Sequence, residues 1–361
     1  MLIELNTKRS KSTIIRIGVD FIETEFQRLK ESFGSKAILI VDEQVDRFHP
    51  QLVANLGKLH DDLLKIVVPA GETSKSLSMF NQILDKALEH GVRRSTVVYV
   101  AGGGVTGDLG AFVAASLLRG LPLIHIPTTL LAMVDSSIGG KTGINHHTGK
   151  NLIGAFYQPE AVLMDISLLS TLPQKEWNCG MGEILKYACI SDPTIFTMGG
   201  DEVSLKTPDL LCDLVFRCAK IKSDIVQEDE LESGKRAFLN FGHTFAHALE
   251  SFTEYQRYAH GEAVYIGLVA ATWLSRQLGA DVDASRLLQW KNTFNLNTRD
   301  LIGYALEIIK KMEHDKKNTE STLRLILLRS WGEPYITDFE DVDLLHKAWI
   351  FALENVDHSQ V

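Results

Sequence analysis

Residues 96–118 read TVVYVAGGGVTGDLGAFVAASLL, and this stretch decides the fold. A run of β-branched residues leads into Gly102-Gly103-Gly104 and then into an apolar, alanine-rich segment from Leu109 to Leu118. β-Branched residues favour strands, and an apolar segment behind a glycine turn indicates a helix. The stretch therefore predicts a strand, a tight turn and a helix, the unit from which parallel α/β sheets are built.

Three runs of the same kind lie on either side of it: KAILIV at 36–41, LKIVV at 64–68 and LPLIHI at 121–126. Short β-branched runs that alternate with helical patterns indicate βαβ units. The first half of the chain is therefore predicted to be a Rossmann-like α/β domain with a parallel sheet. We place this domain at residues 1–170.

The second half, residues 171–361, is predicted to be mostly helical. Strand signals fade from about Glu176, and helical periodicity marks Pro208 to Val226, Ala237 to Phe252 and Glu262 to Leu278. The run LRLILL at 323–328 is the exception, and we expect it to form a short strand or a buried segment.

The composition limits the classes of function. The length of 361 residues suits two domains, each with its own core. Acidic residues outnumber basic ones by 46 to 37, which argues against a general attraction to nucleic acid or anionic membranes. We find no signal peptide and no apolar run of about 18 residues, so a cytoplasmic protein is expected.

The glycine turn is a candidate phosphate cradle. Glycines let backbone N–H groups approach a phosphate, and the helix that follows adds the positive end of its dipole. Gly102, Gly104 and Gly107 satisfy GxGxxG, but the strand is not the first of the chain and no acid stands about twenty residues further on. A plain strand-to-helix turn is the alternative.

Two other segments are typical of binding sites. Asp42 ends the run KAILIV, where an acid could hold ribose hydroxyls, although Asp is equally favoured as a helix N-cap or turn residue. Residues 127–151, PTTLLAMVDSSIGGKTGINHHTGKN, combine hydroxyls, glycines, lysines and an acid. This composition favours a binding loop over a solvated surface loop.

The helical half contains a candidate metal site. His243 and His247 stand four residues apart on one helix face, and His260 begins another probable helix. Thr244 stands where an HExxH protease needs Glu. Together with Glu183, the histidines would form a carboxylate and histidine set that leaves a position open for water or substrate. Spacing alone suggests the pair of His243 and His247.

Several motifs in this order resemble the 3-dehydroquinate synthase family: GGGVTGD, IPTTLLAMVDSSIGGKTGIN, GKNLIGAFYQP, GEILKY, LNFGHTFAHALE and HGEAV. The resemblance runs from about Asp42 to Asp315-Lys316-Lys317. It implies a lyase of the shikimate pathway that converts 3-deoxy-D-arabino-heptulosonate 7-phosphate into 3-dehydroquinate and phosphate. It also implies NAD in the first domain, Zn²⁺ (or Co²⁺) and substrate in the second, and a homodimer.

The resemblance also assigns residues, transferred motif by motif. Glu183, His243 and His260 match the metal ligands. The residues that match NAD contacts are Asp42, Glu72, Lys75, Gly103, Gly104, Val105, Asp108, Thr128, Thr129, Lys141 and Lys150. Gln44 stands where the family pattern has Asn.

The substrate residues implied in the same way form a largely cationic set, which suits a substrate with a carboxylate and a phosphate. They are Arg119, Asp135, Lys141, Lys150, Asn151, Lys186, Lys222, Arg236, Asn240 and His247, joined by one of Lys316 and Lys317. His247 is expected to handle a proton and not to bind the metal.

Three alternatives differ in their chemistry. Other sugar-phosphate cyclases, such as 2-deoxy-scyllo-inosose synthase, act on substrates without the carboxylate. A metal-dependent polyol dehydrogenase would be a net oxidoreductase, and a regulatory module would have no activity. SIGGKTG at 137–143, Asn240, His247 and Asp315-Lys316-Lys317 favour the dehydroquinate branch.

Overall fold

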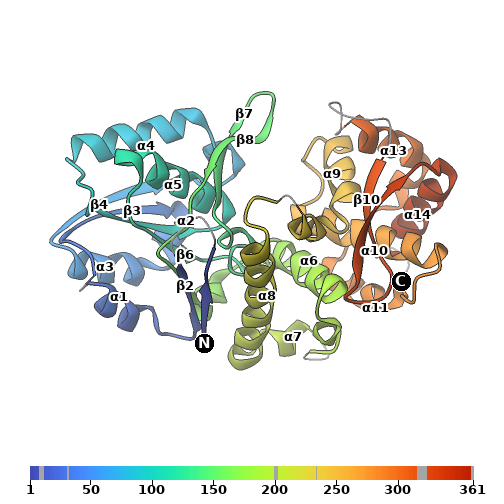
Figure 1. Cartoon of the computed structure of the whole chain (residues 1–361), viewed down its shortest axis with the longest axis horizontal. Helices are drawn as coiled ribbons and strands as arrows, with labels where there is room; N and C mark the ends of the chain where they lie inside the picture. Colours follow the sequence, from blue (N-terminus) through green and yellow to red (C-terminus); the bar gives the residue numbers. More distant parts are fainter. Residues whose placement is uncertain (8–11, 31, 199–201, 233, 315–322, 359–361) are drawn as a thin grey trace. The chain divides into compact units, whose positions relative to one another are not determined.

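A computed structural model of the chain describes residues 1–7, 12–30, 32–198, 202–232, 234–314 and 323–358. Contacts group the chain into two compact units (Figure 1). The first, called the sheet unit, comprises Met1–Pro173 and Thr207–Glu230. The second, called the helical unit, comprises Gln174–Lys206 and Leu231–Val361.

The sheet unit alternates strands and helices. Its strands are β1 (Leu2–Leu5), β2 (Thr13–Gly18), β3 (Lys36–Asp42), β4 (Asp62–Val68), β5 (Val97–Gly102), β6 (Leu123–Pro127), β7 (Lys141–His146), β8 (Gly149–Phe156) and β9 (Ala161–Asp165). Its α-helices are α1 (Ile22–Lys30), α2 (Glu43–Phe48), α3 (Pro50–Leu59), α4 (Leu77–Glu89), α5 (Gly104–Ser116) and α8 (Pro208–Glu228). Short helical turns include η1 (Glu72–Ser74), η2 (Leu117–Arg119), the π-turn η3 (Ala132–Ser136) and η4 (Ile166–Thr171).

In the helical unit the described residues form one two-stranded sheet, β10 (Leu323–Leu328) with β11 (Pro334–Phe339). Its longer helices are α6 (Gln174–Ile190), α9 (His243–Phe252), α10 (His260–Gln277), α13 (Ala305–His314) and α14 (Val342–Asn355). The short helices and turns are η5 (Pro193–Thr197), α7 (Glu202–Leu205), η6 (Lys235–Asn240), α11 (Ser285–Leu288), α12 (Lys291–Phe294) and η7 (Arg299–Tyr304). The expected strand at 323–328 is therefore present.

The large sheet of the described chain has the order β1-β2-β9-β6-β5-β3-β4. All pairs are parallel except β1 with β2, as the βαβ rhythm predicts. Chain order reverses between β3 and β5, because the chain passes outward from β3 to β4 and then returns to β5 on the other side of β3. Such a switch point is where open parallel sheets bind ligands, at the carboxyl ends of the strands.

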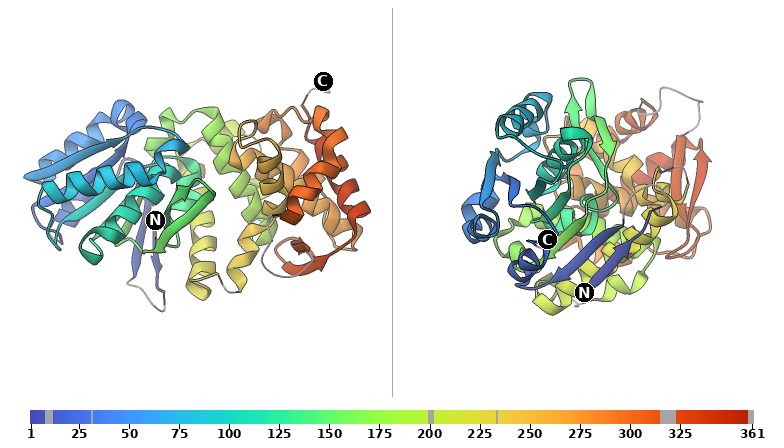
Figure 2. Two further views of the ribbon diagram at one scale, coloured as in Figure 1. Left: turned by 90° about the horizontal axis from the view of Figure 1, so that it is seen from above. Right: turned by 60° about the vertical axis from the view of Figure 1, so that its left-hand side comes forward.

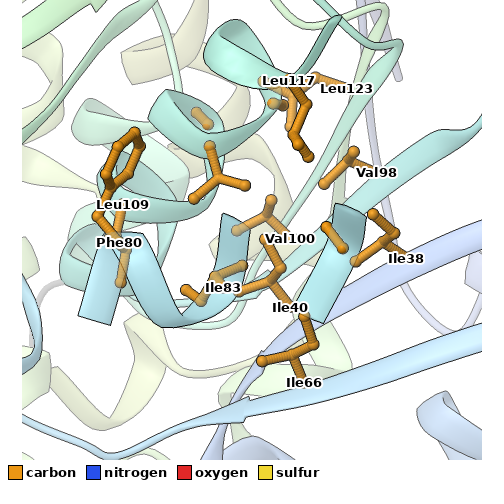
Figure 3. Packing of buried hydrophobic residues seen from close by; sticks show 14 of the residues in the cluster. Ile38, Ile40, Ile66, Phe80, Ile83, Val98, Val100, Leu109, Leu117 and Leu123 are labelled. Atoms are coloured by element: carbon orange, nitrogen blue, oxygen red, sulfur yellow. The ribbon is translucent and has the colours of Figure 1, made fainter. Parts of the chain in front are cut away.

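The central strands β3, β5, β6 and β9 are buried on both faces, which explains why they are continuous apolar runs. On one face Ile38, Val98 and Val100 pack against Phe80 and Ile83 of α4, together with residues of α5 (Figure 3). On the other face Leu39 and Tyr99 belong to a cluster that is completed by side chains of α1, α2 and α3. The hairpin β7–β8 is a separate two-stranded sheet beside these layers (Figure 2).

The division into units differs in one element from a simple boundary at residue 170. Helix α8 comes after that position, yet it contacts β1, β2, η3 and η4 of the sheet unit. Its apolar residues Leu211, Leu214 and Val215 are buried. Helical periodicity predicts that the apolar face of α8 packs against another element, but it does not identify that element.

Helix α10 is the centre of the helical unit, because it contacts α6, α9, α14 and β10. Thirteen of its residues are buried, from Gly261 to Ser275, and it is apolar around most of its circumference. No helix in the described part of the chain is long and apolar enough to span a bilayer. Cys179, Cys189 and Cys218 are buried free thiols, and Cys212 is partly exposed.

Candidate active site

Three candidate cofactor segments lie at the carboxyl edge of neighbouring strands. Asp42 ends β3, the glycine turn ends β5, and Thr128 follows β6. The register places Val41 opposite Ala101 and Gly102 opposite Pro127, so the three strand ends are level. Segments that are far apart in sequence thus meet at the switch point of the sheet.

The glycine turn is packed tightly against the next strand end. A Cβ on Gly103 would lie 2.9 Å from Cγ2 of Thr129, which is closer than real Cβ contacts. Gly103 is also the N-cap of α5, and no side chain caps this helix. The first N–H groups of α5 are therefore not satisfied by a capping side chain, which suits a phosphate group. The residues at this edge fit a phosphate-bearing dinucleotide.

Asp42 has one of the two roles that the sequence left open, and its contact with ribose hydroxyls stays a prediction. Its Oδ1 accepts a hydrogen bond from the Gln44 N–H at 2.8 Å, which makes it the N-cap of α2. The Thr106 hydroxyl donates to its Oδ2 at 3.4 Å. Burial raises the pKa of Asp42 despite these hydrogen bonds. The N-cap occupies Oδ1. Oδ2 faces the sheet edge and has only the weak hydrogen bond from Thr106.

A polar network joins four of the predicted cofactor and substrate residues. The buried Lys75 ammonium donates to Oδ2 of Asp108 and to Oδ1 of Asn151, each at 2.5 Å. Asn145 connects Glu72 to the same network: its amide donates to Glu72 Oε1 at 2.6 Å, and its Oδ1 accepts from the Asn151 N–H at 2.9 Å. Sequence reasoning missed Asn145, although it lies in the polar loop 127–151.

Helix α8 contributes Lys222 to the sheet unit. Its ammonium is 2.8 Å from Oδ1 of Asp135 and donates to the Asp135 carbonyl at 2.6 Å. Asp135 lies in the π-turn η3, a conformation that is frequent at functional sites. Arg119 and Asn151 have φ of 68° and 58°, an uncommon region for residues other than glycine that concentrates at binding sites.

In the helical unit, Glu183, His243 and His260 converge from three helices. Oε1 of Glu183 lies 3.3 Å from Nε2 of His243 and 3.4 Å from Nε2 of His260. The three potential ligand atoms lie within 4.8 Å of one another, the one such group among the described residues. His247 is not part of it, although its ring centroid is 5.6 Å from that of His243.

Glycines beside each of these residues allow the three helices to meet. A Cβ on Gly182 would lie 2.3 Å from the carbonyl oxygen of Gly261, where α6 crosses α10. A Cβ on Gly267 would lie 2.2 Å from the carbonyl oxygen of Gly242, beside the start of α9. Backbones this close bring the side chains of residues 183, 243 and 260 to one point, which helix spacing does not reveal.

The donor set fits a tetrahedral zinc ion. Two ligand atoms about 2.0 to 2.1 Å from such an ion are about 3.3 Å apart, close to the two measured separations. Nδ1 of His243 faces the Phe241 carbonyl at 3.3 Å, and Nδ1 of His260 faces Glu250 at 3.2 Å. Both rings can therefore present an unprotonated Nε2 to a cation.

The charges around Glu183 also favour a bound cation. Burial alone would raise the pKa of Glu183, but Lys186, His243 and His260 lower it well below its usual value. Burial opposes the charged form of His260, yet Glu183 and Glu250 raise its pKa to about 10. Without a metal, the Lys186 ammonium and protons on the neighbouring histidines balance the negative charge of Glu183.

The remaining predicted residues of the helical unit lie near these ligands in sequence. Lys186 and Arg236 are each 2% exposed, and Lys186 donates to Oε2 of Glu183. The Asn240 amide donates to Glu232 Oε1 at 3.2 Å, and His247 is exposed. Lys316 and Lys317 lie outside the described residues, so the choice between them stays open.

Comparison with known families decides what kind of protein has these two sites. The sequence model described as 3-dehydroquinate synthase N-terminal matches residues 65–179, and the one described as 3-dehydroquinate synthase C-terminal matches residues 180–318. A 3-dehydroquinate synthase of Salinibacter ruber is 43% identical over 329 residues, 89% of each chain. The chain belongs to the 3-dehydroquinate synthase family. The resemblance seen in the motifs is thereby confirmed.

Solved structures extend this likeness to the fold. A 2-deoxy-scyllo-inosose synthase in complex with carbaglucose-6-phosphate, NAD⁺ and Co²⁺ has a TM-score of 0.85 at 25% identity, and the match covers 98% of this chain and 100% of that one. A 2-epi-5-epi-valiolone synthase from Streptomyces hygroscopicus with NAD⁺ and Zn²⁺ bound has a TM-score of 0.81 at 23% identity, over 98% and 99%. The predicted fold class, a Rossmann-like sheet followed by a helical part, is confirmed.

Proposed function

We propose that this enzyme converts 3-deoxy-D-arabino-heptulosonate 7-phosphate into 3-dehydroquinate and phosphate. The observation that carries the proposal is the meeting of Glu183, His243 and His260 in a chain of the 3-dehydroquinate synthase family. The overall reaction closes a carbocycle and eliminates phosphate without net oxidation, which makes the enzyme a lyase.

NAD is assigned to the carboxyl edge of the large sheet. The N-terminus of α5 would hold the pyrophosphate, Asp42 the ribose hydroxyls, and Thr128 and Thr129 further polar groups of the cofactor. The network of Glu72, Lys75 and Asp108 would fix the loops that border it. When bound, NAD supplies a hydride acceptor that returns its hydride within one catalytic cycle.

Zinc, or cobalt in its place, is assigned to Glu183, His243 and His260. Three protein ligands leave a fourth position for substrate oxygen, which distinguishes a catalytic from a structural zinc site. When bound, the metal supplies a Lewis acid that polarises the C4 and C5 oxygens of the substrate. Lys186 would hold Oε2 of Glu183 in place, since that oxygen already accepts its hydrogen bond.

The cationic residues would bind the two acidic groups of the substrate. Arginine suits a planar carboxylate or phosphate in two-point contact, and lysine acts as a point charge. We assign this role to Arg119, Lys141, Lys150, Lys186, Lys222 and Arg236. Asp135 would orient Lys222, to which it is ion-paired, while Asn151 and Asn240 would bind hydroxyl groups.

Proton transfer needs few protein groups. The departing phosphate is itself a base, so it can take the C6 proton while the enzyme holds both in position. His247 is exposed beside His243, and histidine is the side chain most often used to transfer protons, so His247 would move a proton on a substrate hydroxyl. It is not needed as a ligand.

A phosphate-release assay tests the proposal directly. With catalytic NAD and Zn²⁺, the heptulosonate phosphate should release one phosphate per turnover without accumulation of NADH, and a chelator should stop the reaction. Turnover of a sugar phosphate without a carboxylate, and none of the heptulosonate phosphate, would instead identify another cyclase. Steady NADH formation from a simple polyol would identify a dehydrogenase.

A cytoplasmic homodimer is the remaining part of the proposal, carried over from the sequence interpretation. Light scattering coupled to size exclusion should give about twice the chain mass of 40.2 kDa. A mass of one chain at micromolar concentration would contradict the dimer without affecting the proposed reaction. Cell fractionation tests the location.

A further inference from the structure

Both ring nitrogens of His260 face carboxylates. Nε2 faces Oε1 of Glu183 at 3.4 Å, and Nδ1 faces Oε1 of Glu250 at 3.2 Å. A carboxylate only accepts hydrogen bonds, so the contact with Glu250 places a proton on Nδ1. A cation held by Glu183 and His243 would need the lone pair of Nε2, and the contact with Glu250 makes Nδ1 the nitrogen that keeps the proton of the neutral ring.

The two histidines of the cluster are oriented in different ways. Nδ1 of His243 faces the backbone carbonyl of Phe241, two residues away in its own chain segment. That acceptor is present whatever side chain stands at 241. His260 depends instead on a side chain from another helix, and its own side chain is 36% exposed, so packing alone does not lock the ring.

Glu250 is well placed for this role. It lies seven residues after His243 on α9, about two turns further along the same helix face. It is 7% exposed, and a buried carboxylate is retained at low cost only where it is paired. Helix α9 thus provides one cluster residue at its first position and the orienting partner of another near its end.

We infer that Glu250 is a positioning residue of the metal centre, which holds the His260 ring and selects the tautomer that binds the metal. This rests on the proposed function, because it requires that Glu183, His243 and His260 bind a cation. Glu250 also adds a negative charge behind His260, which favours a dication in front of it.

The test measures metal binding by the full-length, metal-free protein. Zn²⁺ affinity is obtained by competition with a chromophoric chelator, and Co²⁺ absorption bands report the coordination geometry. Glu250→Ala should weaken Zn²⁺ binding by about 10 to 100-fold and change the Co²⁺ bands. Glu250→Gln should lose less than Glu250→Ala but measurably, about three- to tenfold, since its amide oxygen still accepts from Nδ1 while the negative charge is gone.

Glu262 provides a matched control. It lies two residues after His260, and its Oε2 accepts from the Ala259 N–H at 2.8 Å in the capping box of α10. Glu262→Gln removes the same charge near the same histidine and keeps a residue suited to this cap. Zn²⁺ affinity should therefore stay within about twofold of the parent protein.

Several results would overturn the inference. Parent-like Zn²⁺ affinity and Co²⁺ bands in Glu250→Ala would do so, and so would equal losses in Glu262→Gln and Glu250→Gln. If Glu250→Ala does not fold, the decision rests on Glu250→Gln, where a parent-like Co²⁺ spectrum together with unchanged affinity counts against the role. Failure of the parent protein to bind Zn²⁺ or Co²⁺ would instead refute the proposed metal centre itself.

Discussion

The two candidate sites are built from different materials. At the sheet edge, backbone carries the site: a glycine turn, the start of α5 and level strand ends. In the helical unit, three ionisable side chains carry it, and glycines bring their helices together. The first kind of site follows from sheet topology, whereas the second depends on where helices cross. A substitution that damages one of the two sites should therefore leave the other intact.

Removal of one ligand side chain should have the largest effect, and only on the metal site. His243→Ala should weaken Zn²⁺ binding by more than about 100-fold, because loss of a mere supporting group already costs about 10 to 100-fold. Phosphate release should be lost while the circular dichroism spectrum persists. Zinc content after dialysis and chelator competition measure the binding.

His247 is the control for this substitution. It lies on the same helix face, outside the group of Glu183, His243 and His260. His247→Ala should keep its zinc and lose activity only. Full zinc occupancy in His243→Ala would remove His243 from the ligand set. Zinc loss in His247→Ala would instead support the pair of His243 and His247 that spacing alone suggests.

A single added methyl group should be enough to damage the backbone-built site. The Cβ of Gly103→Ala would meet Thr129 at 2.9 Å, although its φ of −79° suits any residue. Overpacking costs about 1 to 3 kcal/mol, so NAD affinity should fall by the order of tenfold. Zn²⁺ affinity should not change. Isothermal titration with NAD and chelator competition measure the two affinities.

Gly57 in α3 offers the comparison, because a Cβ there would meet nothing within 4 Å. Gly57→Ala should bind NAD like the parent protein. If Gly103→Ala also does so, the glycine turn is a packing feature of the strand-to-helix connection, and the cofactor lies elsewhere.

The same contrast explains what the sequence could predict. Local sequence predicts the elements of the large sheet, because β-branched residues indicate strands and glycines indicate turns. This holds for the strand, turn and helix at 96–118 and for the runs KAILIV, LKIVV and LPLIHI. Their convergence at one edge follows from the parallel arrangement. Strands β1 and β2 were not predicted, although TIIRIG at 13–18 is a β-branched run of the same kind.

The metal ligands were beyond such local reasoning. Spacing singled out His243 and His247, and the family resemblance was needed to choose His260. The reason lies in the contact of Gly182 with Gly261, which no periodicity reports. Helix α8 illustrates the same limit, since its apolar face packs in the sheet unit although its neighbours in sequence belong to the helical unit.

The last prediction concerns two histidines whose pKa values are shifted in opposite directions in the two units. His260 has its pKa raised to about 10 by Glu183 and Glu250, although burial works against it. His125 in β6 is 7% exposed and borders a small cavity together with Gly103 and Gly107. Burial lowers its pKa to about 4, so it stays neutral in the folded sheet unit.

The sign of the pH effect follows from this shift. At pH 7.5 His125 is neutral in both the folded and the unfolded chain and contributes no pH dependence. Below its ordinary value of 6.5 the unfolded chain takes up a proton that the folded chain refuses until about pH 4. The free energy of unfolding should therefore drop as pH falls, by about 2 kcal/mol from this residue between pH 7.5 and pH 5.

His125→Gln should remove that part of the pH dependence, since glutamine is neutral throughout. Hydrogen exchange of the amides of β5 and β6, corrected for intrinsic rates, reports the sheet unit separately from the helical unit. His260 lies in the other unit and is present in both proteins, so its own contribution cancels when the two proteins are compared. Equal losses of protection in the parent and His125→Gln proteins between pH 7.5 and pH 5 would show that His125 is already charged, or solvated, in the folded chain. The glycine turn would then border a wet pocket, and the contrast between a dry, backbone-built site and a charged, side-chain-built one would have to be given up.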